Sequence, residues 1–133
     1  MVARARPNVV DSSAWLAYFA DEPSAGDFAA VIEDVRQLVV PAVCLLEVFK
    51  IVARQRGEGD ALQAVAVMQQ GAVVDLDGAL ALSAARVGLD HQLPLADSIV
   101  YATARGVDGV VWTQDEDFDG LADVHYIPRR RAT

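Results

Sequence analysis

The sequence predicts an α/β fold in which a central, mainly parallel sheet of about five short strands is flanked by helices. Short valine-rich runs alternate with longer segments whose apolar residues recur at helical spacing, in the order βααβααβααβαβ. Strands separated by helices in this way pair in parallel and are covered on both faces. The length of 133 residues and a hydrophobic content of 53% suit one domain, which we expect to extend over residues 1–133.

A short strand and two helices are predicted at the beginning of the chain. The strand is "NVV" (8–10), which ends at Asp11, and Ser12 or Ser13 can cap the helix that follows. The sequence "DEP" then ends this helix, and Ser24 can cap the next one. Four apolar residues of the second helix recur at the spacing of one helix face: Phe28, Val31, Ile32 and Val35.

The second strand, "LVV" (38–40), leads into an unusually apolar helix over residues 42–54. Its charged residues are Glu47, Lys50 and Arg54, which share one narrow stripe because they are three and four positions apart. A helix that is apolar on its other sides packs against the core on one side and is expected to contact a protein partner on another.

Three more helices, three more strands and a single helical turn complete the predicted order. The turn lies between the last two strands, where Phe118 and Leu121 are three positions apart. Helical spacing is found over residues 60–70, 78–90 and 95–105. The strands are "AVVDL" (72–76), "GVVWT" (109–113) and "VHYI" (124–127).

The composition restricts the class of protein. The net charge of −8 argues against nucleic-acid binding, because phosphate repels an acidic surface unless bound cations reverse the local sign. A single cysteine, Cys44, excludes an internal disulfide and predicts a buried, inert thiol in a reducing cytoplasm. A secretion signal is not expected because Asp11 interrupts the first apolar stretch, and no run is long enough to span a membrane.

Four acids lie where a parallel sheet places its ligands or inside apolar segments. Asp11 ends the first strand, and Asp115 lies two residues beyond Thr113, the last residue of the fourth. Glu47 and Asp97 interrupt apolar helices, where a carboxylate is costly to bury unless it is paired or binds a metal.

Each acid also has a purely structural explanation. Asp11 and Asp115 can cap helices, Asp97 suits the positive end of a helix dipole, and Glu47 can pair with Lys50 or Arg54 of its own helix. Lys50 is the single lysine of the chain, so basic partners are few. All four acids having such roles without a shared site is the less favoured explanation.

The stretch "TQDEDFDG" (113–120) begins like a calcium-binding EF-hand loop. The twelfth position of such a loop requires glutamate and here is Tyr126, and the flanking segments are predicted strands. We therefore expect Thr113 and Asp115 to join a site built from several segments, with Asp117 as the undecided member and Asp119 in solvent.

Four motifs in order resemble the PIN-domain nucleases, specifically the VapC-type toxins of prokaryotic toxin–antitoxin pairs. They are "VVDSSAWLAYF", "PAVCLLEVFK", "LPLADSIVYATA" and "VWTQDEDFDGL", which together span nearly the whole chain. The resemblance implies a three-layer sandwich and a Mg²⁺- or Mn²⁺-dependent ribonuclease activity. The residues it assigns are an acidic quartet, a fifth possible ligand and two supporting hydroxyls: Asp11, Glu47, Asp97 and Asp115, then Asp117, then Ser12 and Thr113.

The chemistry of RNA hydrolysis agrees with such an acidic site. An attacking water and a leaving oxygen both need stabilisation, which oxygen-ligated Mg²⁺ provides. His91 and His125 lie outside the motifs, so a histidine-based mechanism has little support. Without metal, the converging carboxylates should repel one another and raise some of their pKa values.

Partners are implied by the resemblance and by the apolar helix 42–54. The resemblance implies a cognate antitoxin that binds in an apolar groove, and a homodimer. We expect Leu62, Val65 and Met68 of the next helix to extend the apolar surface. Lys50 and Arg54 are the better candidates for contacts with RNA phosphates. The arginines at the chain ends are expected to be solvated, with contact to phosphate or to the antitoxin as the alternative: Arg4, Arg6, Arg129, Arg130 and Arg131.

Other functional classes remain open on the sequence alone. A haloacid-dehalogenase-type phosphatase also has an aspartate after its first strand, but expects a second aspartate where Ser13 stands. A receiver-like signalling domain lacks its acidic pair and lysine here. A PIN-like interaction module without activity is the third alternative, and metal-dependent RNA cleavage separates the nuclease from all three.

Overall fold

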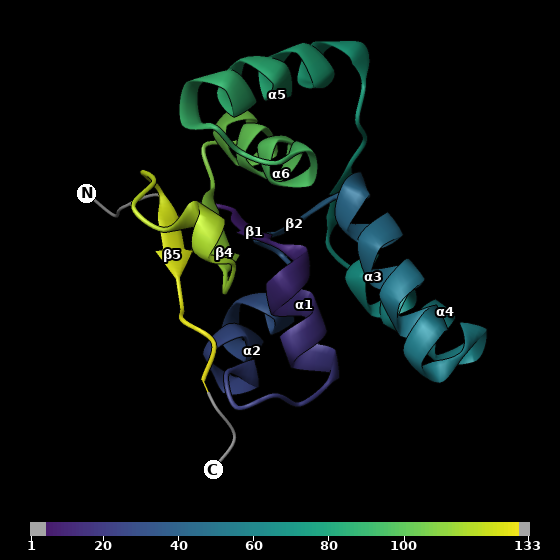
Figure 1. The fold of residues 1–133 in the computed structure, drawn as a ribbon. Helices are drawn as coiled ribbons and strands as arrows, with labels where there is room; N and C mark the ends of the chain where they lie inside the picture. Colours follow the sequence, from purple (N-terminus) through teal and green to yellow (C-terminus); the bar gives the residue numbers. More distant parts are fainter. Residues whose placement is uncertain (1–4, 131–133) are drawn as a thin grey trace.

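The computed structural model describes residues 5–130 and shows a five-stranded sheet between helices (Figure 1). The strand order is β3-β2-β1-β4-β5, and every neighbouring pair is parallel. This confirms the predicted α/β class. The strands are β1 (Asn8–Val10), β2 (Leu38–Pro41), β3 (Ala72–Val74), β4 (Val110–Thr113) and β5 (Val124–Tyr126).

Helices cover both faces of the sheet, so the fold has three layers with the sheet in the middle. The helices are α1 (Ser12–Phe19), α2 (Ala25–Glu33), α3 (Ala42–Arg56), α4 (Glu58–Met68), α5 (Gly78–His91), α6 (Leu95–Gly106) and the short 3₁₀ helix η1 (Glu116–Phe118). Helix α6 packs against β1, β2 and β4, whereas α2 packs against β1 and β2. Figure 1 shows α5 and α6 on one side of the strands and α2 on the other, with the α3–α4 pair beside α1.

The predicted serine cap is wrong at α1, whereas at α2 Ser24 is the N-cap residue but makes no side-chain capping bond. Asp11, not a serine, caps α1, because Ser12 and Ser13 already lie inside the helix and their hydroxyls bind acids. Ser24 precedes α2, but its hydroxyl lies 2.6 Å from the Gln114 side chain and makes no capping bond. Val35, predicted on the apolar face of α2, lies beyond the end of that helix and is exposed.

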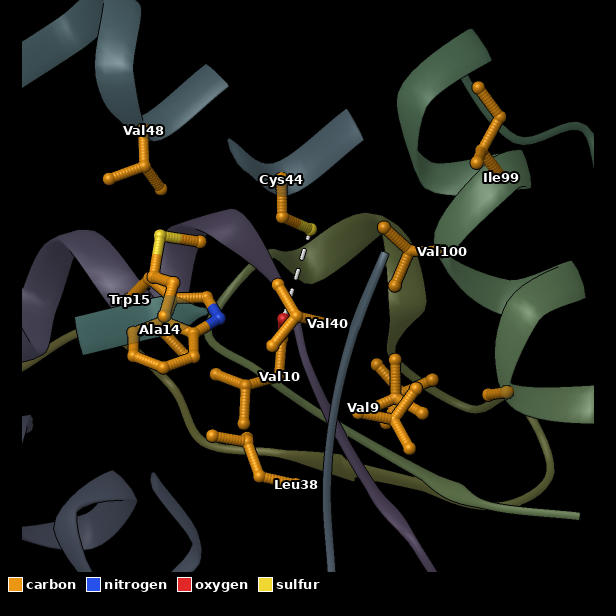
Figure 2. Packing of buried hydrophobic residues seen from close by; sticks show 14 of the residues in the cluster. Val9, Val10, Ala14, Trp15, Leu38, Val40, Cys44, Val48, Ile99 and Val100 are labelled. Atoms are coloured by element: carbon orange, nitrogen blue, oxygen red, sulfur yellow. Dashed lines mark hydrogen bonds between the residues drawn. The ribbon is translucent and has the colours of Figure 1, made fainter. Parts of the chain in front are cut away.

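The core lies between β1, β2 and the helices above them. Figure 2 shows Cys44 of α3 directed at Val10 of β1, with Val40 of β2 alongside. The Cys44 Sγ lies 3.8 Å from the Val10 carbonyl oxygen, and burial raises the pKa of the thiol well above its ordinary value. The predicted buried, inert cysteine is therefore confirmed.

The side of helix α4 that faces the core differs from the one that the sequence predicts. Met68, predicted on an outer apolar surface, is completely buried, whereas Leu62 is 57% exposed. The sequence spacing gives the apolar face of α4 but not its rotation against α3, which decides which residues enter the core.

Two of the described arginines near the chain ends, Arg6 and Arg130, form ion pairs with acids of the same chain, whereas Arg129 is in no ion pair among residues 5–130. Arg6 Nη1 lies 2.9 Å from Asp123 Oδ1, and Arg130 Nη2 lies 3.0 Å from Asp27 Oδ2. Arg4 and Arg131 lie outside the described residues. No helix between residues 5 and 130 is long and apolar enough to cross a membrane.

Candidate metal centre

The acidic residues meet where the strand order reverses. β1 pairs with β2 on one side and with β4 on the other, so the carboxyl ends of β1 and β4 form the topological switch point of the sheet. Asp11 follows β1, and its N–H continues the ladder by donating to the Trp112 carbonyl oxygen at 3.0 Å. Thr113 ends β4, and Asp115 follows two residues later.

Asp11 is buried and held by hydroxyl groups. Its Oδ2 accepts a hydrogen bond from Ser13 Oγ at 2.8 Å and another from Thr113 Oγ1 at 2.9 Å. Burial raises the pKa of the Asp11 carboxyl, the hydroxyl donors oppose this, and the negative charge of Asp115 adds to it. Both hydroxyls bind the same carboxylate oxygen, Oδ2, so neither of them binds the other oxygen of Asp11, Oδ1.

Asp97, Asp115 and Asp117 form a close group of carboxylates. Each contributes an oxygen atom that lies within 4.8 Å of the other two. Asp97 is in the first turn of α6, while Asp115 caps η1 by accepting from the Asp117 N–H at 3.0 Å. Asp117, undecided from the sequence, is thus a full member of this group, and Asp119 is exposed as expected.

The pKa of Asp97 is raised by burial and by the negative charge of the neighbouring acids. Burial, followed by the charges of Asp11 and Asp115, raises this pKa to about 8. The Asp97 carboxyl therefore holds a proton at neutral pH when no cation is present.

Glu47 enters from α3 and is bound by Ser12. The Ser12 hydroxyl donates to Glu47 Oε1 at 2.6 Å, which fixes the carboxylate beside the first turn of α1. The ion pairs among residues 5–130 do not include a pair of Glu47 with Lys50 or Arg54, so that alternative has no support. Neither Glu47 nor Asp11 is among the three members of the aspartate group. The charge of Asp11 acts on Asp97 after the effect of burial, whereas Glu47 is placed by its bond to Ser12.

The chemistry of these residues fits a hard divalent cation. In the described part of the chain, none of the five acids forms a salt bridge with a basic side chain. The hydrogen-bond donors to Asp11, Glu47 and Asp115 are hydroxyls and backbone N–H groups, so no basic side chain balances the negative charge of these acids. Several carboxylate oxygens without a basic partner are the ligand set that Mg²⁺ and Mn²⁺ prefer.

Sequence reasoning missed the position of Ser13. The sequence predicts Ser12 and Thr113 as supporting hydroxyls, and the structure adds Ser13, whose hydroxyl contacts both Asp11 and Thr113. The feature of the sequence that could have indicated Ser13 is its position two residues after β1, in the first turn of α1, because this turn lies beside the end of β4. Lys50 and Arg54 are exposed on α3 and contact none of the acids by hydrogen bond or ion pair in the described structure.

Comparison with known proteins identifies the fold family. A family model of the PIN domain matches residues 9–124. The chain belongs to the PIN domain family. No curated protein is similar enough in sequence to count as a match.

Solved structures of PIN-type toxins have the same fold. A toxin–antitoxin complex from Klebsiella pneumoniae superimposes with a TM-score of 0.74 at 18% identity, over 91% of this chain and 99% of that one. Mycobacterium tuberculosis VapC20, named as a sarcin-ricin loop cleaving toxin, gives 0.73 at 20% identity over 88% and 98%. DNA-bound VapBC from Salmonella typhimurium gives 0.71 at 12% identity over 95% and 100%. At these identities, the similarity establishes the PIN fold of this chain.

Proposed function

We propose that this PIN domain is a metal-dependent endoribonuclease of the VapC toxin type, inhibited by a cognate antitoxin. The observation that carries the proposal is the close group of carboxylates formed by Asp97, Asp115 and Asp117, none of which has a salt bridge in the described structure. The pKa of Asp97 is raised by burial and then by the charge of Asp11, which supports adding Asp11 to the group. Similarity to toxins, one of them named as a sarcin-ricin loop cleaving toxin, supports the same proposal. The proposed unit is a single domain over residues 1–133.

The proposed ligands are Asp11, Glu47, Asp97, Asp115 and Asp117. Mg²⁺ or Mn²⁺ bound here lowers the pKa of a water and stabilises negative charge on phosphate oxygens. Asp11 and Glu47 are oriented for this role by hydroxyl donors from Thr113 and Ser12. Asp97 must release its proton when a cation binds, so metal affinity rises with pH up to about 8.

RNA binding requires positive charge on a chain whose net charge is −8. Bound cations supply part of it at the site itself. Lys50 and Arg54 lie one and two turns after Glu47 on α3 and are exposed, so we assign them to contacts with RNA phosphates. Localisation in the cytoplasm, where RNA is the substrate, is part of this proposal.

The proposed antitoxin site is a groove between α1, α3 and α4. The groove has a volume of about 530 Å³, and its apolar walls include Leu16, Phe19, Ile51 and Val67. Charged residues of both signs stand at its edges: Glu22, Asp60, Arg56 and Arg129. On the outer side of α3, Leu46 is 63% exposed and belongs to a second apolar surface with Phe49 and Val65. We assign the groove to an antitoxin segment and leave the second surface for the proposed homodimer.

An RNA cleavage assay with matched variants tests the proposed activity. Purified protein is incubated with total RNA and Mg²⁺ or Mn²⁺, and the new RNA ends are sequenced. We expect defined internal cuts by the wild type, and none with EDTA or with Asp97→Asn. The control is Asp119→Asn, which removes an exposed acid a few residues from Asp115 and should cleave normally.

Three results would contradict the proposed activity. Cleavage by Asp97→Asn at the wild-type rate would place the chemistry elsewhere. The lack of cleavage by any form, with either metal, would favour an inactive PIN-like interaction module. Hydrolysis of small phosphoesters in place of RNA would support the phosphatase alternative.

A further inference from the structure

We propose that the Ser13 hydroxyl is a positioning group, which holds the Asp11 carboxylate and the backbone before Asp115 in one hydrogen-bonded frame. This inference rests on the proposed metal-dependent function. Ser13 lies in the first turn of α1, two residues after Asp11, and its side chain is only partly buried.

The Ser13 oxygen has a donor bond and an acceptor bond to different parts of the sheet. It donates to Asp11 Oδ2 at 2.8 Å, and it accepts from the Gln114 N–H at 3.1 Å. The first bond fixes the acid that follows β1, while the second fixes the chain that leaves β4. One hydroxyl therefore links the two central strands at the edge where the acids gather.

Thr113 repeats this arrangement one residue away. Its hydroxyl donates to the same Asp11 oxygen at 2.9 Å and accepts from the Asp115 N–H at 2.9 Å. Each hydroxyl has one proton, and both protons are directed at Asp11, so the 3.1 Å separation of Ser13 Oγ and Thr113 Oγ1 is a contact of two oxygens. Two successive N–H groups after β4 are thus both held by hydroxyls that are anchored on one carboxylate.

This frame continues to the aspartate group. Asp115 Oδ1 accepts from the Asp117 N–H, so the position of the Asp115 backbone also sets where Asp117 lies. A hydrogen bond to a charged carboxylate is stronger than one between neutral groups. Of the two bonds of the Ser13 hydroxyl, the one to Asp11 is therefore stronger than the one from the Gln114 N–H. The Ser13 N–H is 3.4 Å from the same oxygen, so the hydroxyl makes the shorter contact.

The two serines after Asp11 therefore have different partners. Ser12 Oγ bonds to Glu47, and Ser13 Oγ bonds to Asp11. Groups that orient metal ligands in this way commonly change metal affinity by about 10- to 100-fold when they are removed. We expect Ser13→Ala to weaken metal binding by about 10-fold, because Thr113 still holds one side of Asp11.

Binding of Mn²⁺ to the purified protein, measured by calorimetry, tests this role. Ser13→Ala should raise the Kd for Mn²⁺ by about 10-fold and should raise the Mn²⁺ concentration that half-saturates RNA cleavage by a similar factor. Ser13→Thr, which keeps a hydroxyl, should restore both values. The control is Thr103→Val, which removes a buried hydroxyl that bonds to the Ile99 carbonyl oxygen, away from the acids. Its unfolding midpoint should fall while its Kd for Mn²⁺ stays at the wild-type value.

The outcomes separate this inference from the proposed function. A wild-type protein that binds no Mn²⁺ would overturn the metal centre itself. Wild-type binding together with an unchanged Kd in Ser13→Ala would overturn only the positioning role.

Discussion

Replacing Asp97 with asparagine should stabilise the metal-free protein at neutral pH. The pKa of Asp97 is about 8 in the folded protein against 3.8 for an unperturbed aspartate, first because of burial and then because of Asp11 and Asp115. The folded state therefore binds this proton more tightly than the unfolded chain does. The stabilisation is present below about pH 4 and is lost as the pH rises through about 8, so the charged form destabilises the fold.

The size of the effect follows from the two pKa values. They differ by roughly 4, which at full strength corresponds to about 5 kcal/mol. Solvent at the open side of the site screens part of this repulsion, and the neighbouring acids share it, so we expect a gain of about 1 to 2 kcal/mol at pH 7. For a domain of this size, such a gain raises the melting temperature by about 3 to 8 °C.

Urea unfolding in EDTA measures this difference directly. Asp97→Asn should exceed the wild type in unfolding free energy near neutral pH, and the two curves should converge toward about pH 4, where the aspartate is protonated in both states. Asp119→Asn, which alters an exposed acid, should unfold like the wild type. Added Mn²⁺ should reverse the order, because only the wild type gains stability from binding.

One result would refute this reasoning. If Asp97→Asn is less stable than the wild type at every pH in EDTA, Asp97 is a structural partner of another group. Repulsion between the acids would then not lower the stability of the metal-free fold.

Three further predictions concern residues around the site. Ser12→Ala should slow RNA cleavage by about 10-fold, because it removes the hydrogen bond that holds the Glu47 carboxylate. Its urea midpoint should change little. An unchanged rate would show that Glu47 does not depend on the Ser12 hydroxyl. Lys50→Ala should raise KM for RNA at constant kcat and reduce the salt dependence of binding, and a KM equal to that of the wild type would remove Lys50 from the RNA surface. Met68→Ala should cost about 2 to 5 kcal/mol of unfolding free energy because it empties a core position, whereas Leu62→Ala should change it by less than about 0.5 kcal/mol; equal losses would mean that the two residues are equally buried.

The strands and helices were largely readable from the sequence because local patterns decide them. The valine-rich run before Asp11 forms β1, and the apolar period after Pro94 forms α6. The last two residues predicted for β3, Asp75 and Leu76, lie outside the strand and are exposed. Asp75 has no ladder partner in the described sheet, and composition alone does not reveal where pairing stops.

The positions of the acids were also predictable, but the details of their support were not. Strand ends and apolar surroundings indicated Asp11, Glu47, Asp97 and Asp115. The bond of Ser13 to the Gln114 N–H joins residues about a hundred positions apart, and only the register of β1 against β4 brings them together. The membership of Asp117 similarly depends on the turn of η1, which three residues form.

The placement of β1 in the middle of the sheet has a consequence for synthesis of the chain. β1 pairs with β2 early, but its other edge is empty until β4, a hundred residues later, leaves the ribosome. The acids at positions 11 and 47 are then made long before those at 97, 115 and 117, so an unfinished chain holds only part of the set. A nascent chain is therefore unable to bring the proposed ligand set together until residue 117 has emerged, whereas the segments that form α1, α3 and α4 emerge earlier.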